Sequence, residues 1–189
     1  MLDAEDLVLS LVHLCGDRRE FGRTTLQKMA YLSTVALRWQ RVGHQAHFYG
    51  PFSRPLERTT ARLVADGFVE ESADDLGFYG AGGYRAKQFH YRLTDAGEMR
   101  MKALRGDNPE DVERLEAFVE GVQGVIGGFD QKVLSLAAKV YFIVDGHQSP
   151  VTHGQIIERA TELGWTISSA QVGQVAELLQ KLQLLREKR

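Results

Sequence analysis

The sequence predicts an α+β protein that is mainly helical. Apolar residues recur at intervals of three and four over most of the chain, which is typical of helices that bury one face. Residues 68–71 and 89–93 instead resemble strands, and the segment between them, 72–86, is rich in glycine and suited to a loose turn. The chain therefore predicts a β-hairpin set among helices.

Two helices are expected within the first 41 residues. Residues 3–15 carry an apolar stripe that ends at Gly16. A second, longer helix is expected from Thr24, which is suited to cap it, to about Arg41. Residues 44–49 are rich in aromatic residues and histidine. They suit either an extended connection or a short third strand beside the hairpin.

The third helix has the clearest limits. Ser53 is suited to cap its N-terminus, and Pro55 falls in the first turn, where its missing N–H costs nothing. Gly67 is suited to the left-handed conformation that ends a helix after Asp66. One face is apolar, and another carries Arg54, Arg58 and Arg62. Helix, strand, turn and strand in this order predict a winged helix-turn-helix domain with the hairpin as its wing.

The rest of the chain is expected to be helical. Five helices are predicted, at residues 94–104, 110–126, 131–144, 152–163 and 169–185. The last three suggest a bundle with a second helix-turn-helix-like module. We therefore predict a winged-helix domain at 1–105, a linker and possible dimerisation helix at 106–127, and a helical bundle at 128–189.

Composition limits the class of protein. The chain has 189 residues, 43% of them hydrophobic and 25% charged, which is ordinary for a soluble globular protein. It has no apolar run long enough to span a membrane and no signal segment after Met1, so a cytoplasmic location without a membrane partner is expected. The single cysteine, Cys15, lies in an apolar helical pattern and is expected to be packed.

The net charge of −2 hides an uneven distribution. Residues 106–189 carry eight basic and twelve acidic residues. Residues 18–62 carry two acidic residues against nine basic ones, namely Arg18, Arg19, Arg23, Lys28, Arg38, Arg41, Arg54, Arg58 and Arg62. Only the first half thus has the local charge of a nucleic-acid-binding protein.

Candidate DNA contacts follow from this pattern. Arginines on the third helix fit phosphates or guanine edges in a major groove, and basic residues on a wing fit the backbone. The N-terminus of the second helix is suited to a phosphate, although Gln27 and Lys28 are equally suited to pairing within the protein. The candidate nucleic-acid-binding residues are Thr24, Gln27, Lys28, Ser53, Arg54, Arg58, Arg62, Arg85 and Lys87.

No enzymatic constellation is recognisable in the sequence. His44 and His47 are three residues apart, but no third or fourth metal ligand follows at a suitable spacing. The glycine-rich segment lacks the lysine and hydroxyl residue of a phosphate-binding loop, and no serine lies in a nucleophile elbow. We therefore expect no catalysis, no metal and no cofactor.

Several motifs resemble a known family. They are residues 25–32 (TLQKMAYL), residues 48–53 (FYGPFS), the leucine, glycine and strand pattern of residues 63–69, and residues 91–97 (YRLTDAG). Residues 5–105 thereby resemble winged helix-turn-helix proteins of the uncharacterised prokaryotic YwgA-like group and, more distantly, Panacea-type antitoxins. The resemblance implies a fold more firmly than an activity. The second helix departs from the pattern of typical winged-helix regulators, because it is longer and more apolar.

Two functional hypotheses follow. The first is a sequence-specific DNA-binding regulator that contacts double-stranded DNA as a homodimer, because two copies are needed to span two half-sites. The alternative is a non-enzymatic adaptor or antitoxin-like module whose winged helix binds a protein partner. The mildly acidic chain and its acidic second half favour the alternative.

Overall fold

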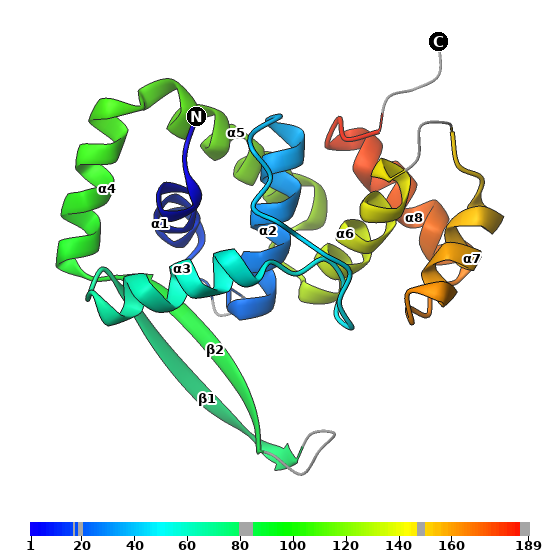
Figure 1. Cartoon of the computed structure of the whole chain (residues 1–189), viewed down its shortest axis with the longest axis horizontal. Helices are drawn as coiled ribbons and strands as arrows, with labels where there is room; N and C mark the ends of the chain where they lie inside the picture. The colour runs from blue at the N-terminus through cyan, green and yellow to red at the C-terminus, as the bar shows by residue number, and fades with distance from the viewer. Residues whose placement is uncertain (17, 19–20, 80–84, 147–149, 186–189) are drawn as a thin grey trace.

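The chain forms an α+β structure that is mainly helical, as predicted. The computed structural model describes residues 1–16, 18, 21–79, 85–146 and 150–185. In Figure 1 the hairpin projects from one side of a helical body, and α6–α8 gather at the end away from α4. The described elements are α1 (Ala4–Cys15), α2 (Arg23–Ala36), α3 (Arg54–Ala65), β1 (Val69–Tyr79), β2 (Arg85–Leu93), α4 (Asp95–Asp107), α5 (Pro109–Ile126), α6 (Gln131–Asp145), α7 (His153–Glu162) and α8 (Ser169–Lys181).

The second helix is shorter than predicted. It begins at Arg23 after Gly22, so Thr24 lies inside the first turn and is not the N-cap. It ends at Ala36 and does not reach Arg41. Arg38 adopts a left-handed conformation with φ of 56°, and the N–H of Trp39 bonds back to the carbonyl of residue 34 at 2.8 Å. This turn returns the chain over the end of α2 and starts a long connection, residues 37–53.

The third helix has the predicted limits. Ser53 caps it, since its Oγ accepts a hydrogen bond from the N–H of Leu56 at 3.1 Å. Gly67 takes φ of 76°, and the N–H of Phe68 bonds to the carbonyl of Leu63 at 3.0 Å. The turn at Gly67 therefore leads directly from α3 into β1.

The hairpin is much longer than predicted. Residues 72–79, expected as part of a loose turn, continue β1 and pair with β2, with an irregularity between Asp75 and Tyr79. Gly77 lies at that irregularity with φ of 76°. At about 3.4 Å per residue, the eleven residues of β1 extend about 35 Å. The predicted tip glycines Gly80, Gly82 and Gly83 lie outside the described residues.

Residues 44–49 do not add a third strand to the hairpin. The described sheet has two strands, and Gln45 instead forms an isolated antiparallel bridge with Phe52. The 37–53 connection therefore folds back on itself next to α2.

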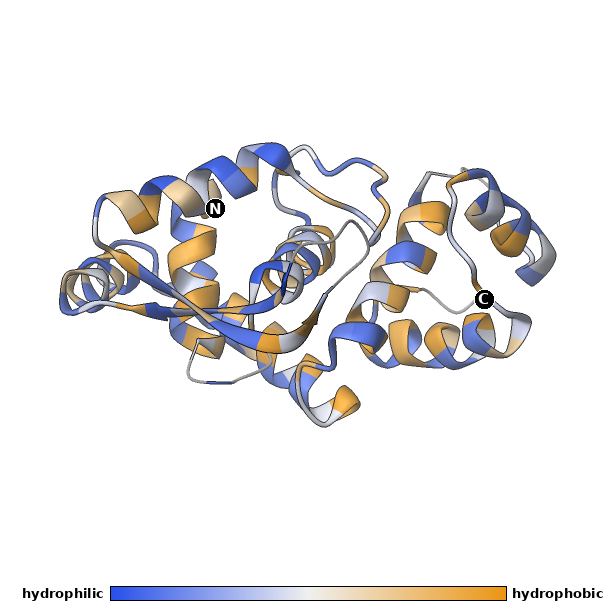
Figure 2. Cartoon of the chain, turned by 90° about the horizontal axis from the view of Figure 1, so that it is seen from below, coloured by the Kyte–Doolittle hydropathy of each residue, from blue (hydrophilic) through white to orange (hydrophobic). Residues whose placement is uncertain are grey.

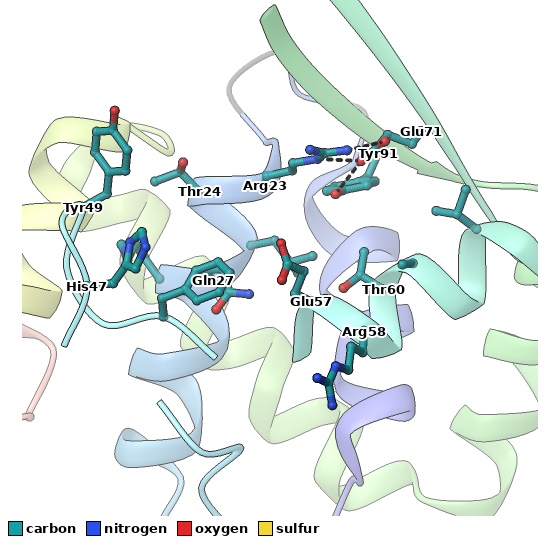
Figure 3. Close-up of a pocket in the computed structure, with 15 residues that line it drawn as sticks. Arg23, Thr24, Gln27, His47, Tyr49, Glu57, Arg58, Thr60, Glu71 and Tyr91 are labelled. Carbon is teal, nitrogen blue, oxygen red and sulfur yellow. Dashed lines mark hydrogen bonds and ion pairs between the residues drawn. The ribbon is translucent and has the colours of Figure 1, made fainter. Parts of the chain in front are cut away.

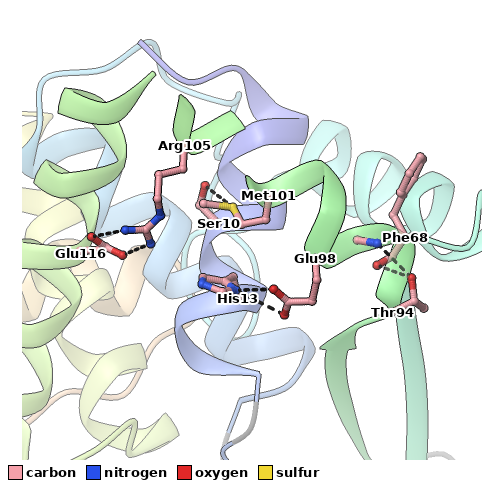
Figure 4. Close-up of polar contacts among 9 residues, drawn as sticks. Ser10, His13, Phe68, Thr94, Glu98, Met101, Arg105 and Glu116 are labelled. Carbon is pink, nitrogen blue, oxygen red and sulfur yellow. Dashed lines mark hydrogen bonds and ion pairs between the residues drawn. The ribbon is translucent and has the colours of Figure 1, made fainter. Parts of the chain in front are cut away.

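Helix α4 packs between α1, α5 and the base of the hairpin (Figure 4). Ser10 contacts the sulfur of Met101 at 3.6 Å, and His13 pairs with Glu98 at 3.1 Å. A Cβ at Gly97 would lie 2.1 Å from the carbonyl oxygen of Phe68. Only glycine at this position lets the first turn of α4 approach the start of β1.

The apolar stripe of α5 is covered by the same chain. Val112, Leu115 and Val122 are fully buried, and α5 packs against α1, α2, α4 and α8. The predicted module boundary, between residues 105 and 106, lies within the last turn of α4, and Asn108 alone separates α4 from α5. A dimer contact through this helix would therefore have to use its polar, exposed face.

Helices α6–α8 form the predicted C-terminal group, with α6 packed against α2. Thr152 and Ser168 cap α7 and α8 with complete capping boxes. The last helix ends at Lys181, before the predicted Leu185. Within the described residues, no helix combines the length and apolarity required to cross a lipid bilayer.

Replacing Leu115 with Ala should lower the free energy of unfolding by about 2–5 kcal/mol, because the side chain is fully buried on the apolar stripe of α5. Chemical denaturation measures the change. The matched control is Glu113→Ala, an exposed position on the same helix, which should shift stability by no more than about 0.5 kcal/mol. Equal effects of the two substitutions would contradict the packing of α5.

Candidate nucleic-acid interface

Three of the predicted contact residues form a buried cluster that positions α3. The side-chain amide of Gln27 donates to the carbonyl of Ser53 at 3.1 Å and accepts from its N–H at 2.8 Å. The hydroxyl of Ser53 also donates to the carbonyl of Val42. Gln27 and Ser53 are both buried. Of the two roles predicted for Gln27, pairing within the protein is the one observed.

Lys28 also pairs within the protein. Its side chain is 1% exposed, and its ammonium donates to the carbonyl of Pro51 at 2.7 Å. Burial, and then the neighbouring charge of Lys139, lower the pKa of Lys28 to about 8. Among the described residues no carboxylate pairs with it. The fold thus holds a buried positive charge whose hydrogen-bond partner is the backbone carbonyl of Pro51.

The arginines of α3 lie on an exposed face, as predicted, but they differ in their partners. Arg62 is held by Glu5 of α1 at 2.5 Å. Arg54 and Arg58 are exposed, and within the described part of the chain neither has an ion pair or side-chain hydrogen bond. These two guanidinium groups are therefore available to an external ligand.

The two basic residues predicted on the hairpin also differ. Arg85 pairs with Asp75 across the strands at 2.6 Å. Lys87 is exposed opposite Asp75 and has no ion pair among the described residues. Thr24 is half-buried where the first turn of α2 faces the hairpin. The hairpin therefore offers one unpaired lysine and several charges that neutralise one another.

A contact that the sequence did not reveal ties the hairpin to α2. Arg23 makes a bidentate pair with Glu71 at 2.8 and 2.7 Å, and its guanidinium stacks 3.5 Å from the ring centroid of Phe89. The hydroxyl of Tyr91 donates to the same carboxylate at 2.7 Å. Hydrogen bonds from Arg23 and then Tyr91 lower the pKa of Glu71. No local signal links residues so far apart in sequence.

A cavity of about 500 Å³ lies between α2, α3, the hairpin base and the 47–52 segment. Figure 3 shows His47 and Tyr49 on one side and Glu71 with Tyr91 on the other. Glu57 projects from α3 between them, while Arg58 extends from α3 on the side away from Arg23. The apolar residues that line the cavity include Leu26, Phe52, Ala61 and Val64.

His44 and Cys15 are packed side chains of the protein interior. His44 lies against Tyr31 with ring centroids 5.2 Å apart, and burial lowers its pKa to about 4. Cys15 is buried, as expected, and burial raises the pKa of its thiol to about 12. Within the described residues no three histidine, cysteine or acidic side chains are grouped so as to hold a metal ion.

Comparison with known proteins adds no relative. No protein-family model matches the chain, and no curated protein matches its sequence. The resemblance to the YwgA-like group and to Panacea-type antitoxins therefore remains a prediction from the motifs.

The lowered pKa of Lys28 predicts a pH-dependent stability. Between about pH 8 and its ordinary pKa of 10.5, the unfolded chain retains the Lys28 proton that the folded chain has lost. The unfolded state then binds more protons, so this residue's contribution to stability rises with pH. From pH 7.5 to 9, the wild type should gain about 1 kcal/mol relative to Lys28→Met in urea unfolding. Parallel pH profiles of the two proteins would contradict the burial of a protonated lysine.

Proposed function

We propose that the chain is a DNA-binding, regulator-like protein that uses α3 and the hairpin as a winged helix on double-stranded DNA. The element order supports this, since three helices precede a two-stranded hairpin and α3 leads directly into it. The 37–53 connection between α2 and α3 is a departure, because a helix-turn-helix usually has a turn of about three or four residues.

The observation that carries the proposal is the pair of unpaired, exposed arginines on α3. Arg54 and Arg58 lie one turn apart, so both guanidinium groups can face the same groove. Arginine donates in a bidentate manner to guanine and to phosphate, and a helix fits the major groove. Lys87 on the hairpin is suited to a backbone phosphate beside it.

A homodimer belongs to the same proposal. Two copies of α3 would contact half-sites about 34 Å apart, which gives the specificity that one short helix lacks. The polar outer face of α5 is a candidate for that contact, since its apolar stripe is used within the chain.

Replacing Arg54 and Arg58 together with Ala should weaken binding to a random-sequence DNA duplex pool at least tenfold. It should also make the binding less dependent on salt, because two phosphate-contacting cations are lost. Fluorescence anisotropy at two salt concentrations measures both effects. The matched control is Arg159→Ala, which removes an exposed arginine from α7, where it pairs with Glu162 at 2.5 Å.

The Arg62→Ala substitution refines this experiment. Because Arg62 is held by Glu5, its loss should weaken DNA binding less than the loss of Arg58 does. If the Arg54 and Arg58 double variant binds as tightly as the Arg159 control, α3 is not the DNA-reading helix.

A protein partner is the second candidate, favoured by apolar side chains that remain exposed. Tyr79 and Phe78 on the hairpin, together with Phe48 and Tyr49 on the connection, are each at least half exposed. Hydrophobic colour returns near the far end of a mainly hydrophilic hairpin in Figure 2. Exposed apolar patches of this kind mark interaction sites.

The DNA-binding and protein-binding candidates predict opposite outcomes for duplex binding and for the Phe78→Ser variant. For a protein-binding module, duplex DNA should not bind even at low salt, and Phe78→Ser should lose a co-purified partner while the protein stays folded. For a DNA-binding protein, Phe78→Ser should leave duplex affinity unchanged within about twofold, because the residue carries no charge.

A further inference from the structure

The cavity beside α3 combines an apolar interior with positive charge that the protein does not neutralise. Lys28 lines it and has no carboxylate partner among the described residues. A second cation, Lys139, lies close by, and Gly50 lies next to both lysine side chains. A Cβ on Gly50 would be 3.5 Å from Lys28 Cε and 3.1 Å from Lys139 Cγ. A buried charge without a counter-ion is costly, so this arrangement is complementary to an anion.

The acidic residues of the lining do not cancel this charge. Glu71 is already engaged by two hydrogen bonds from Arg23 and one from Tyr91. Glu57 is exposed on α3, and Arg58 is adjacent to it. Setting the Arg23 and Glu71 pair aside, Lys28 and Arg58 outnumber Glu57, so the lining retains a net positive charge.

The walls suit a flat ring. His47 and Phe52 lie with ring centroids 5.1 Å apart on one side, and Ala61 and Val64 are apolar lining residues that α3 contributes. A volume of about 500 Å³ is within the range of small-molecule sites, which are mostly apolar with a few polar groups.

From these features we infer that the cavity binds a small aromatic organic anion, with its ring between the 47–52 segment and α3 and its charge directed toward Lys28 and Arg58. Because Arg58 also belongs to the proposed DNA-binding face, the bound anion competes with DNA. This second statement rests on the proposed function, whereas the binding site itself does not.

The probe is 8-anilinonaphthalene-1-sulfonate, an aromatic anion whose fluorescence reports binding, titrated into the full chain without DNA. Saturable one-to-one binding is expected. N-phenyl-1-naphthylamine, which has nearly the same rings without the sulfonate, should bind at least tenfold more weakly. Equal binding of the two probes would overturn the anion site.

Variants locate the probe. Ala61→Trp fills the cavity from an exposed helix position, and Lys28→Met removes the buried charge; each should weaken probe binding at least tenfold. Glu57→Gln should tighten it, because a repelling carboxylate is lost. Phe78→Ser tests adsorption to the exposed hairpin and should change nothing. Retained binding in Ala61→Trp, with a fold unchanged by circular dichroism, would overturn the assignment.

Arg54→Ala separates this inference from the proposed function. Arg54 does not line the cavity, so this variant should lose DNA affinity and keep probe affinity. Probe binding without any DNA binding would reject the proposed function alone. DNA binding that the probe does not displace from the wild type would reject the competition alone.

Discussion

The position of α3 depends on one set of hydrogen bonds made by neighbouring residues of α2. Gln27 holds both backbone groups of Ser53, and Lys28 holds the carbonyl of Pro51. These bonds fix the residue that caps α3, so they set where the helix begins and which of its faces is exposed. At the same end of the 37–53 connection, the bridge between Gln45 and Phe52 adds two backbone hydrogen bonds. The middle of the connection is held through Trp165, whose indole N–H donates to the carbonyl of His47 at 2.7 Å.

The sequence predicted the limits of α3 well because the signals at its two ends are local. A capping serine, a proline in the first turn and a terminal glycine act within a few residues of one another. The ends of α2 and β1 were not predictable in this way. Arg38 gives no sign that it will turn left-handed, and residues 72–79 look like a loop until cross-strand pairing with β2 makes them a strand. In the hairpin, pairing with a strand distant in sequence overrides local preference.

The charge pattern shows the same limit. The basic residues of the 18–62 segment outnumber its acidic ones, yet Arg23, Arg41 and Arg62 each pair with an acid outside the segment, on β1, α6 and α1 respectively. Lys28 is buried as well. A count along the chain therefore overstates the positive field, and only the folded structure separates Arg54 and Arg58 from the arginines that are already neutralised. Gln27 and Ser53, which were predicted as nucleic-acid contacts, bond to each other and position α3.

Lys28 links the cavity on one side of α3 to the cap at the start of the helix, because it lines the cavity and also bonds to the carbonyl of Pro51. A hydrophobic residue at position 28 would avoid the cost of burying an ammonium group, but it would leave the carbonyl of Pro51 without this donor. Retaining lysine keeps the cap of α3 in place and also puts an uncompensated charge in the wall of the cavity. Glu57 and Arg58, in one turn of α3, both line the cavity and are both exposed to solvent. Under the proposed function, a change in charge inside the cavity would act on Arg58, which lines the cavity and also belongs to the proposed DNA-binding face.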